Sequence, residues 1–351
     1  MYRKSLCVDR TSHNFFGNRL GSIRDFQSQA WKAAYDELEP YSDIYVDFIL
    51  RHNLFPKNYY WPIDPLHNFT RIWEYPYICH QLMQYVPVLP GQKPKVFDVG
   101  SALTFMPSFL ASRGYDVTAS DCDPLMKQTF ALIESCDGVP IGVTDVRYIT
   151  CDCRQIGEEK TSWYDVVLCT SVLEHVPQRE RALQEFHRIL KPGGKLILTI
   201  DLQWHPSSSA LNPEDFYTFL AECDKYFHQI EPDIQVHPVD VLRMSNHPKN
   251  FTVKASHLRR TIMDRLPPLR TLVPRIVHLA KRWVTGREKE LDRWCVYGMI
   301  LIRRECEFIE KEKDYIKPYS PHPNQQIQVL GSKLPIELGE NDKFRKNFQK
   351  D

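Results

Sequence analysis

The run from Val96 to Pro124, VFDVGSALTFMPSFLASRGYDVTASDCDP, constrains the fold of this chain more than any other stretch. A short apolar strand meets Gly100, a helical stretch ends at Gly114, and an alternating stretch leads into Asp121. This pattern is half of a nucleotide-binding βαβ unit. An acid at the end of the second strand can accept hydrogen bonds from the hydroxyls of a ribose. The run therefore predicts a site for a cofactor that contains adenosine.

The loop after the first strand narrows the choice of cofactor. A dinucleotide site uses G-x-G-x-x-G, so that a pyrophosphate rests on bare backbone amides at a helix N-terminus. Here the loop is GSALTF, with one glycine, and Pro107 follows in the first helical turn. S-adenosylmethionine carries no phosphate, and its amino-acid end needs only a few polar partners. Asp98, Gly100 and Ser101 are the candidates for that role.

At this point the chain resembles the class I S-adenosylmethionine-dependent methyltransferases. It is most similar to the type 11 branch, which modifies small molecules and glycans. The resemblance covers about Arg71 to Leu202 and runs without a gap from Val96 to Met126. Three further segments follow in the family's order: VRYITCDCRQI at 146–156, YDVVLCTSVLEHVP at 164–177 and LKPGGKLILTIDL at 190–202.

The resemblance implies a fold and a set of site residues. The fold is a doubly wound, mostly parallel, seven-stranded α/β sheet of Rossmann-like type, with an N-terminal helical cap and a late insertion. Asp121 takes the ribose position and Asp152 the position near the adenine amino group, with Cys122 and Cys153 beside them. Thr170 ends the fourth strand at the same edge of the sheet, because ligands of such sheets lie at the carboxyl ends of the strands.

The chain also departs from the family pattern. The family loop is D-x-G-x-G-x-G, and Ala102 and Thr104 stand where the second and third glycines are expected. One alternative is therefore a non-catalytic, methyltransferase-like module that binds only cofactor or a partner. A second alternative is a nucleotide-sugar or NAD enzyme of Rossmann type.

The chain divides into three predicted parts. Residues 1–68 form an N-terminal helical and aromatic extension, 69–305 the methyltransferase domain, and 306–351 a polar C-terminal tail. An insertion at about 231–293 precedes the last strand of the domain, where the family often builds substrate specificity.

Four elements outside the central motif are also predicted. Two helices are expected around Ser22 to Leu38 and Ser42 to His52, and a third from Thr70 to about Tyr85. Trp294 to Arg303 reads as a buried strand, corresponding to the antiparallel last strand of the methyltransferase sheet.

The helix that precedes the domain carries the sequence RIWEYP. Arg71 and Glu74 are three residues apart, so they can form an ion pair on one helix face. Alternatively, resemblance to some glycan-cluster methyltransferases implies that Arg71 binds the methionine carboxylate. The nearby aromatic residues are either core or a lid over the site: Tyr59, Tyr60, Trp61, Trp73, Tyr75 and Tyr77.

Methyl transfer needs little from the protein, because a sulfonium methyl group is already activated. The acceptor must lie in line with the S–CH3 bond, and a base assists if the acceptor is a hydroxyl. His175, Asp201 and His205 are the candidate bases for transfer to an oxygen, or another heteroatom, of a small molecule or glycan. No metal site is predicted, since no cluster has the spacing of metal ligands.

Composition excludes several other functions. With 45 Lys plus Arg against 44 Asp plus Glu, no overall field attracts nucleic acid. The 10 cysteines include no C-x-x-C pair, and no signal peptide or membrane-spanning segment is evident, so a cytoplasmic protein is expected. The basic stretch 254–289 reads either as a solvated helical face or as a peripheral contact for anionic lipid or phosphate.

Overall fold

A computed structural model describes most of the chain between Gly17 and Arg304. Within that span, the residues outside the description are 57, 58, 60, 63, 69, 158, 204–209, 231–232, 244–245 and 247–293. The basic stretch 254–289, the predicted tail at 306–351 and most of the predicted insertion therefore lie outside the described residues.

Five parallel strands form the centre of the sheet. They are β2 (Lys95–Val99), β3 (Asp116–Asp121), β4 (Val146–Thr150), β5 (Tyr164–Thr170) and β6 (Leu190–Gln203). Strand β2 pairs with β3 on one side and with β5 on the other, so the strand order reverses beside β2. In such sheets, ligands bind at the carboxyl ends of the strands near this switch.

Antiparallel strands complete the sheet beyond β6. Strand β8 (Trp294–Arg303) pairs along β6, and β7 (Phe227–Gln229) pairs with the end of β8. These seven strands confirm the predicted doubly wound, mostly parallel sheet and its antiparallel last strand. An eighth strand, β1 (Arg19–Leu20), was not predicted and pairs with the middle of β8.

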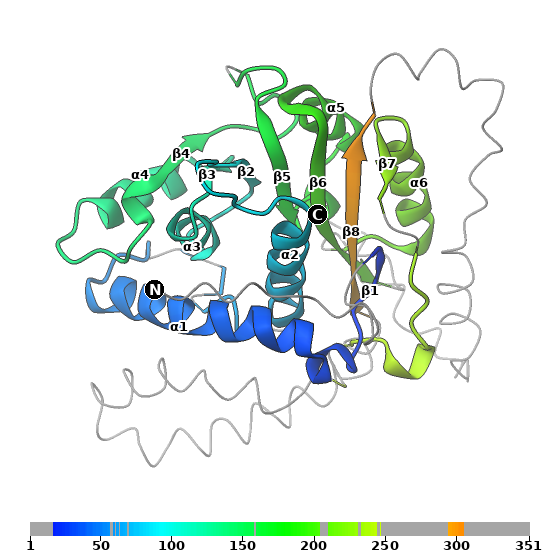
Figure 1. Ribbon diagram of the computed structural model, residues 1–351, viewed down its shortest axis with the longest axis horizontal. Helices are drawn as coiled ribbons and strands as arrows, with labels where there is room; N and C mark the ends of the chain where they lie inside the picture. Colours follow the sequence, from blue (N-terminus) through cyan, green and yellow to red (C-terminus); the bar gives the residue numbers. More distant parts are fainter. Residues whose placement is uncertain are drawn as a thin grey trace, which may run out of the picture.

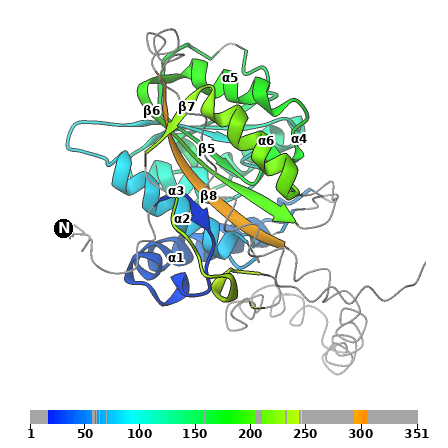
Figure 2. The same ribbon diagram turned by 90° about the vertical axis from the view of Figure 1, so that its right-hand side faces the viewer.

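Helices cover both faces of the sheet (Figures 1 and 2). One face carries α1 (Gln29–Arg51), α2 (Arg71–Tyr85), α3 (Met106–Ser112) and α4 (Pro124–Glu134), and the other carries α5 (Arg179–Ile189) and α6 (Pro213–Asp224). Four 3₁₀ turns lie at Asp25–Gln27, Val143–Asp145, Leu173–His175 and Pro238–Asp240. Along β5, Val166 packs on the face that carries α1 to α4, and Val167 packs on the face that carries α5 and α6. This alternation is the two-residue period of a strand that is buried on both faces.

The N-terminal extension forms one long helix, so the prediction of two helices was wrong. Helix α1 begins after Ser28, whose hydroxyl oxygen accepts the Trp31 N–H at 3.1 Å, and it continues through Pro40. A proline inside a helix costs about 3 kcal/mol. Pro40 faces solvent, while a continuous buried face runs past it on the other side of the helix and outweighs that cost.

The extension is tied to the sheet by buried polar contacts. The Trp31 indole donates to the Ile72 carbonyl at 3.0 Å and holds α1 against α2. Asp25 pairs with Arg19 at 3.0 Å and accepts from the Trp73 indole at 2.7 Å. Residues 17–51 are therefore part of the same packed body as the sheet.

At Gly298 of β8, side chains of α2 lie close to the backbone of the sheet. A Cβ at this position would lie 2.5 Å from Tyr77 Cε1 and 3.0 Å from Trp73 Cη2. The two rings are stacked 4.7 Å apart, and the Tyr77 hydroxyl is held by the Gly17 carbonyl at 2.8 Å. Neither ring can move without disturbing its neighbours.

We expect Gly298→Ala to lower the free energy of unfolding by about 1–3 kcal/mol, the usual effect of overpacking a rigid core. Urea denaturation of the two proteins measures the difference. In a Tyr77→Ala background the added methyl group finds room, so the effect of Gly298→Ala should largely disappear. An equal loss in both backgrounds would show that Tyr77 does not cause it.

Candidate active site

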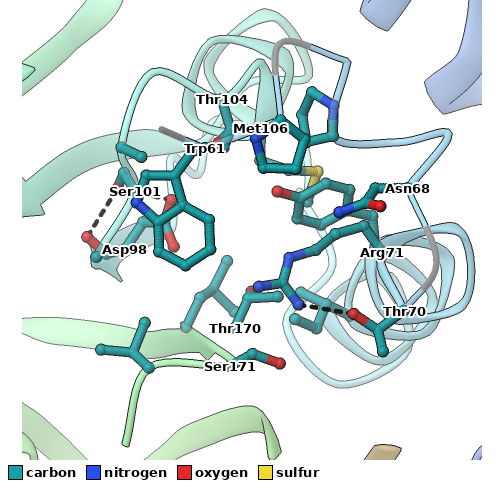
Figure 3. Close-up of a pocket in the computed structure, with 18 of the residues that line it drawn as sticks. Trp61, Asn68, Thr70, Arg71, Asp98, Ser101, Thr104, Met106, Thr170 and Ser171 are labelled. Atoms are coloured by element: carbon teal, nitrogen blue, oxygen red, sulfur yellow. Dashed lines mark hydrogen bonds between the residues drawn. The ribbon is translucent and has the colours of Figure 1, made fainter. Parts of the chain in front are cut away.

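A cavity of about 190 Å³ lies at the carboxyl ends of β2, β5 and β6 (Figure 3). Its walls come from the loop after β2, the ends of β5 and β6, the start of α2 and the 59–70 segment. Of the predicted site residues, the structure brings six together here: Arg71, Asp98, Gly100, Ser101, Thr170 and Asp201.

Gly100 makes the first turn of the cavity loop. Its φ of +64° lies in the left-handed region, and a Cβ there would meet Val172 Cγ2 at 2.6 Å. Glycine is therefore required at this position both for its backbone angle and for the close approach of the turn after β5.

Ala102 adopts a left-handed conformation where the family has glycine, with a φ of +46°. Two contacts hold it there. Its N–H donates to an Asp121 carboxylate oxygen at 3.1 Å, and its carbonyl accepts the Tyr148 hydroxyl at 2.7 Å. The loop is thus closed over β3 and β4 without the second glycine.

Asp98 lies at the end of β2 and faces the cavity. The Ser101 hydroxyl donates to its carboxylate at 2.8 Å and to its carbonyl at 3.0 Å. Burial raises the pKa of Asp98 to about 7, although the Ser101 hydrogen bond opposes the rise. The carboxyl group therefore changes charge close to neutral pH.

Arg71 begins α2 and points its guanidinium group into the cavity (Figure 3). It forms the predicted ion pair with Glu74, and its Nη1 also donates to the Thr70 hydroxyl at 3.2 Å. Burial alone lowers the pKa of Arg71, but the charges of Glu74 and Asp201 outweigh this and raise it. Arg71 is therefore a permanent cation at the cavity wall.

Asp201, at the end of β6, is the one candidate base that the described structure places in the cavity wall. Its backbone N–H donates to Glu174 Oε1 at 3.1 Å. Burial and the neighbouring Asp201 charge raise the pKa of Glu174 well above its usual range. The cavity wall thus contains the carboxyl group of Asp201, and the buried carboxyl group of Glu174 lies behind it, next to the Asp201 backbone.

The other two candidate bases are placed differently. His175 is exposed at the end of the 3₁₀ turn after β5, and it does not line the cavity. His205 lies outside the described residues.

Four of the predicted cofactor residues lie along the same sheet edge but outside the cavity: Asp121, Cys122, Asp152 and Cys153. Asp121 accepts the Ala102 N–H and, at 2.9 Å, the Asp123 N–H, and burial raises its pKa. The Cys122 N–H also donates to Asp121, so of the about four lone-pair sites of an ionised carboxylate one remains for a ligand.

Asp152 is less available to a ligand than Asp121. It forms a salt bridge with Arg154 at 2.5 Å, and the Arg154 hydrogen bonds lower its pKa. Burial raises the pKa of Cys153 to about 12 and also raises that of Cys122. Both thiols are therefore protonated at neutral pH and are weak nucleophiles.

The aromatic residues divide between the cavity wall and the core. Tyr59 and Trp61 line the cavity, and the Trp61 indole lies opposite Arg71 across it (Figure 3). Trp73 and Tyr77 are core residues, while Tyr75 is buried and also contributes to the cavity wall. Tyr60 lies outside the described residues.

His67 anchors the segment that carries Tyr59 and Trp61. One ring nitrogen lies 2.7 Å from Asp64 and the other 3.1 Å from the Tyr35 hydroxyl of α1. Burial acts to lower the pKa of His67, but the Asp64 hydrogen bond and the acidic neighbours raise it overall. The His67 ring therefore connects the segment that carries Tyr59 and Trp61 to the N-terminal helix.

Sequence reasoning missed the environment of Glu74. The structure buries its side chain completely, and its carboxylate also accepts hydrogen bonds from Ser171 and, at 2.6 Å, from Thr199. These hydroxyls are 97 and 125 residues away along the chain, so no local pattern links them to Glu74.

Comparison with known proteins identifies the central segment. Residues 97–198 match the family model described as a methyltransferase domain. The ubiquinone biosynthesis O-methyltransferase of Pseudomonas aeruginosa is 36% identical over 107 residues, which are 30% of this chain and 43% of that protein. The chain thus aligns with less than half of that relative, and both Arg71 and Asp201 lie outside the family match.

Solved structures show only a loose overall likeness. The cyclase SpnF has a TM-score of 0.44 at 15% identity, covering 66% of this chain and 82% of SpnF. Phosphoethanolamine N-methyltransferase 2 of Haemonchus contortus has a TM-score of 0.41 at 14% identity, covering 74% of this chain and 57% of that protein.

We expect Ala102→Gly to raise the free energy of unfolding by about 1 kcal/mol, because glycine removes the strain of a left-handed alanine. Ala111→Gly is the matched control. Ala111 is similarly buried, at 7% exposure against 6% for Ala102, but lies in a right-handed helix. The control should lose about 0.5–1 kcal/mol in the same urea titration. Equal losses in both variants would contradict a strained loop.

Proposed function

We propose, from the class I methyltransferase domain that this chain carries at residues 97–198, that the protein transfers a methyl group from S-adenosyl-L-methionine to an oxygen of a small molecule or glycan. One observation carries the proposal: Arg71, Asp98 and Asp201 face a single cavity at the sheet's switch point. The cavity thus presents a cation and two carboxylates at the carboxyl ends of the strands, where sheets of this type bind their ligands.

The residues present fit the donor. A free amino acid has an ammonium group and a carboxylate, which complement Asp98 and Arg71 respectively. A Cβ at Gly100 would collide with Val172 of the cavity wall, so glycine keeps the cavity loop in this shape. The cavity of about 190 Å³ is below the range of about 300–1,000 Å³ typical of whole ligand sites. It suits the amino-acid end, with the adenosine extending along the edge toward Asp121.

S-adenosyl-L-methionine, when bound, supplies an electrophilic methyl group on sulfur. The protein's own contribution is orientation, since alignment of acceptor and donor can account for much of the rate. Tyr59 and Trp61 line the cavity, and we assign them the role of a lid that excludes water from the bound donor and so strengthens the charged contacts inside the site. Asp201 accepts the proton of an acceptor hydroxyl, with Glu174 behind it.

The composition supports a small or glycan acceptor over nucleic acid, because the chain has nearly equal numbers of cationic and anionic residues. Within the described residues, no helix is both long and apolar enough to cross a membrane. All eight cysteines that the structure describes are free thiols, which supports a location in the reducing cytoplasm.

Isothermal titration with S-adenosyl-L-methionine, followed by an assay for S-adenosylhomocysteine release across an acceptor panel, tests the proposal. Binding together with turnover on a hydroxyl-bearing acceptor is the expected result. Binding without turnover across the panel would favour the non-catalytic module. Binding of NAD instead of the methyl donor would favour the dinucleotide enzyme.

We expect Asp121→Ala to weaken donor binding by about 1–3 kcal/mol, the effect of removing a part-buried hydrogen-bond acceptor. Asp116→Ala is the matched control, because Asp116 begins the same strand at the opposite edge and pairs there with Lys95. The control should bind the donor as the wild type does. Unchanged affinity in Asp121→Ala would show that the ribose lies elsewhere.

Donor affinity should fall as the pH is lowered through about 7, the raised pKa of Asp98. Only the ionised carboxylate attracts the donor's ammonium group, so the limiting slope is about tenfold per pH unit. Asp98→Asn should remove this dependence. A flat wild-type binding profile would contradict the role of Asp98.

The same raised pKa of Asp98 makes the unliganded protein lose stability as the pH rises from about 4 to 7, since the folded state binds the proton more tightly than the unfolded state.

A further inference from the structure

Glu74 is a buried carboxylate that does not itself line the cavity. One of its oxygens, Oε2, accepts from Arg71 Nη1. The other, Oε1, accepts from the Ser171 hydroxyl and from the Thr199 hydroxyl. Glu74 therefore connects the start of α2 to the segment after β5 and to the middle of β6.

The hydroxyl donors are themselves held in place. The Ser171 N–H donates to the Thr199 carbonyl at 3.1 Å, and the two hydroxyl oxygens lie 3.4 Å apart. Ser171 adopts a left-handed φ of +46°, in the turn that follows β5. The two hydroxyl partners of Glu74, on Ser171 and Thr199, are thus held in place. An exposed intrahelical ion pair has no such fixed partners, and its side chains are mobile.

These contacts leave part of Arg71 directed at the cavity. Nη1 is engaged by Glu74 and Thr70, on the protein side. Among the described residues, no hydrogen bond engages Arg71 Nε or Nη2. A guanidinium group has five N–H donors in a rigid plane, so fixing Nη1 leaves three donors whose direction is also fixed. Two parallel donors match a carboxylate.

We propose that Glu74 is a positioning residue, which aims the free edge of the Arg71 guanidinium group at the carboxylate of the bound donor. The proposal rests on the function proposed above. Without Glu74, the Arg71 side chain can turn away from the cavity. The hydrogen bonds of Glu74 therefore determine the specificity for ligands that carry a carboxylate. Its counterpart for the ligand's ammonium group is Asp98.

Glu74→Gln tests this with two ligands, S-adenosyl-L-methionine and 5′-methylthioadenosine, which lacks the amino-acid end. The amide keeps the size of the side chain but loses the charge that holds Arg71. We expect the affinity for S-adenosyl-L-methionine to fall at least tenfold, with the affinity for 5′-methylthioadenosine within twofold of the wild type. In an Arg71→Ala background, Glu74→Gln should cause no further loss.

Glu185→Gln is the matched control, because Glu185 and Arg188 also form an intrahelical pair three residues apart, in α5. It should leave both affinities unchanged. If Glu74→Gln does not fold, Thr199→Val removes one hydroxyl donor to Glu74 and keeps the carboxylate. It should give a two- to fivefold loss for S-adenosyl-L-methionine alone.

The results separate this inference from the proposed function. Equal weakening of both ligands, or no weakening of either, overturns the positioning role while donor binding by the wild type stands. Failure of the wild type to bind S-adenosyl-L-methionine overturns the proposed function itself, and the positioning role with it.

Discussion

The buried carboxylate of Glu74 is the interaction on which the candidate site depends. A charge removed from water is very unfavourable unless it is paired and hydrogen-bonded. Glu74 meets this condition with one guanidinium group and two hydroxyls, which come from three different elements. Because the carboxylate needs all of them, α2 is held against the ends of β5 and β6, and the cavity between them keeps its walls. The Arg71–Glu74 pair that stabilises this packing also places a cation in the cavity wall.

Two non-glycine residues in the cavity wall, Ala102 and Ser171, have strained, left-handed backbone conformations. Gly100, Ala102 and Ser171 all have positive φ angles, in the loops that follow β2 and β5. A left-handed conformation costs a non-glycine residue about 1–2 kcal/mol, so it persists only where the surroundings enforce it. For Ala102 the enforcing groups are Asp121 and Tyr148, and for Ser171 they are Glu74 and Thr199. These hydrogen bonds thus hold both loops in left-handed conformations at the cavity wall.

The sequence predicted the sheet better than it predicted the site. Strands β2 to β6 and β8 have strong periodic patterns, and glycine or an acid marks where several of them end, so local rules locate them. The sequence did not predict that α1 continues through Pro40 as one helix. The stability of this helix comes from packing against α2, and no local sequence pattern shows that contact. The Arg71–Glu74 pair was predicted, but its hydroxyl partners were not, because they approach only when the sheet has formed. Glu174 and His175 are adjacent in the sequence, but the short turn that carries them buries Glu174 and leaves His175 exposed. The sequence alone does not show which of the two faces solvent.

The limits of the family match divide the site into two parts with different origins. The matched segment, 97–198, supplies Asp98, Gly100 and the acids at the ends of β3 and β4, to which we assign the ammonium group and the nucleoside of the proposed donor. Arg71 and Trp61 precede that segment and Asp201 follows it, yet all three line the same cavity. The matched domain therefore supplies one part of the cavity wall, and the flanking segments supply the residues for which we propose carboxylate binding, cover and base. Differences in substrate between this chain and its relatives should arise mainly from these flanks, because a change there alters the cavity without disturbing the central strands.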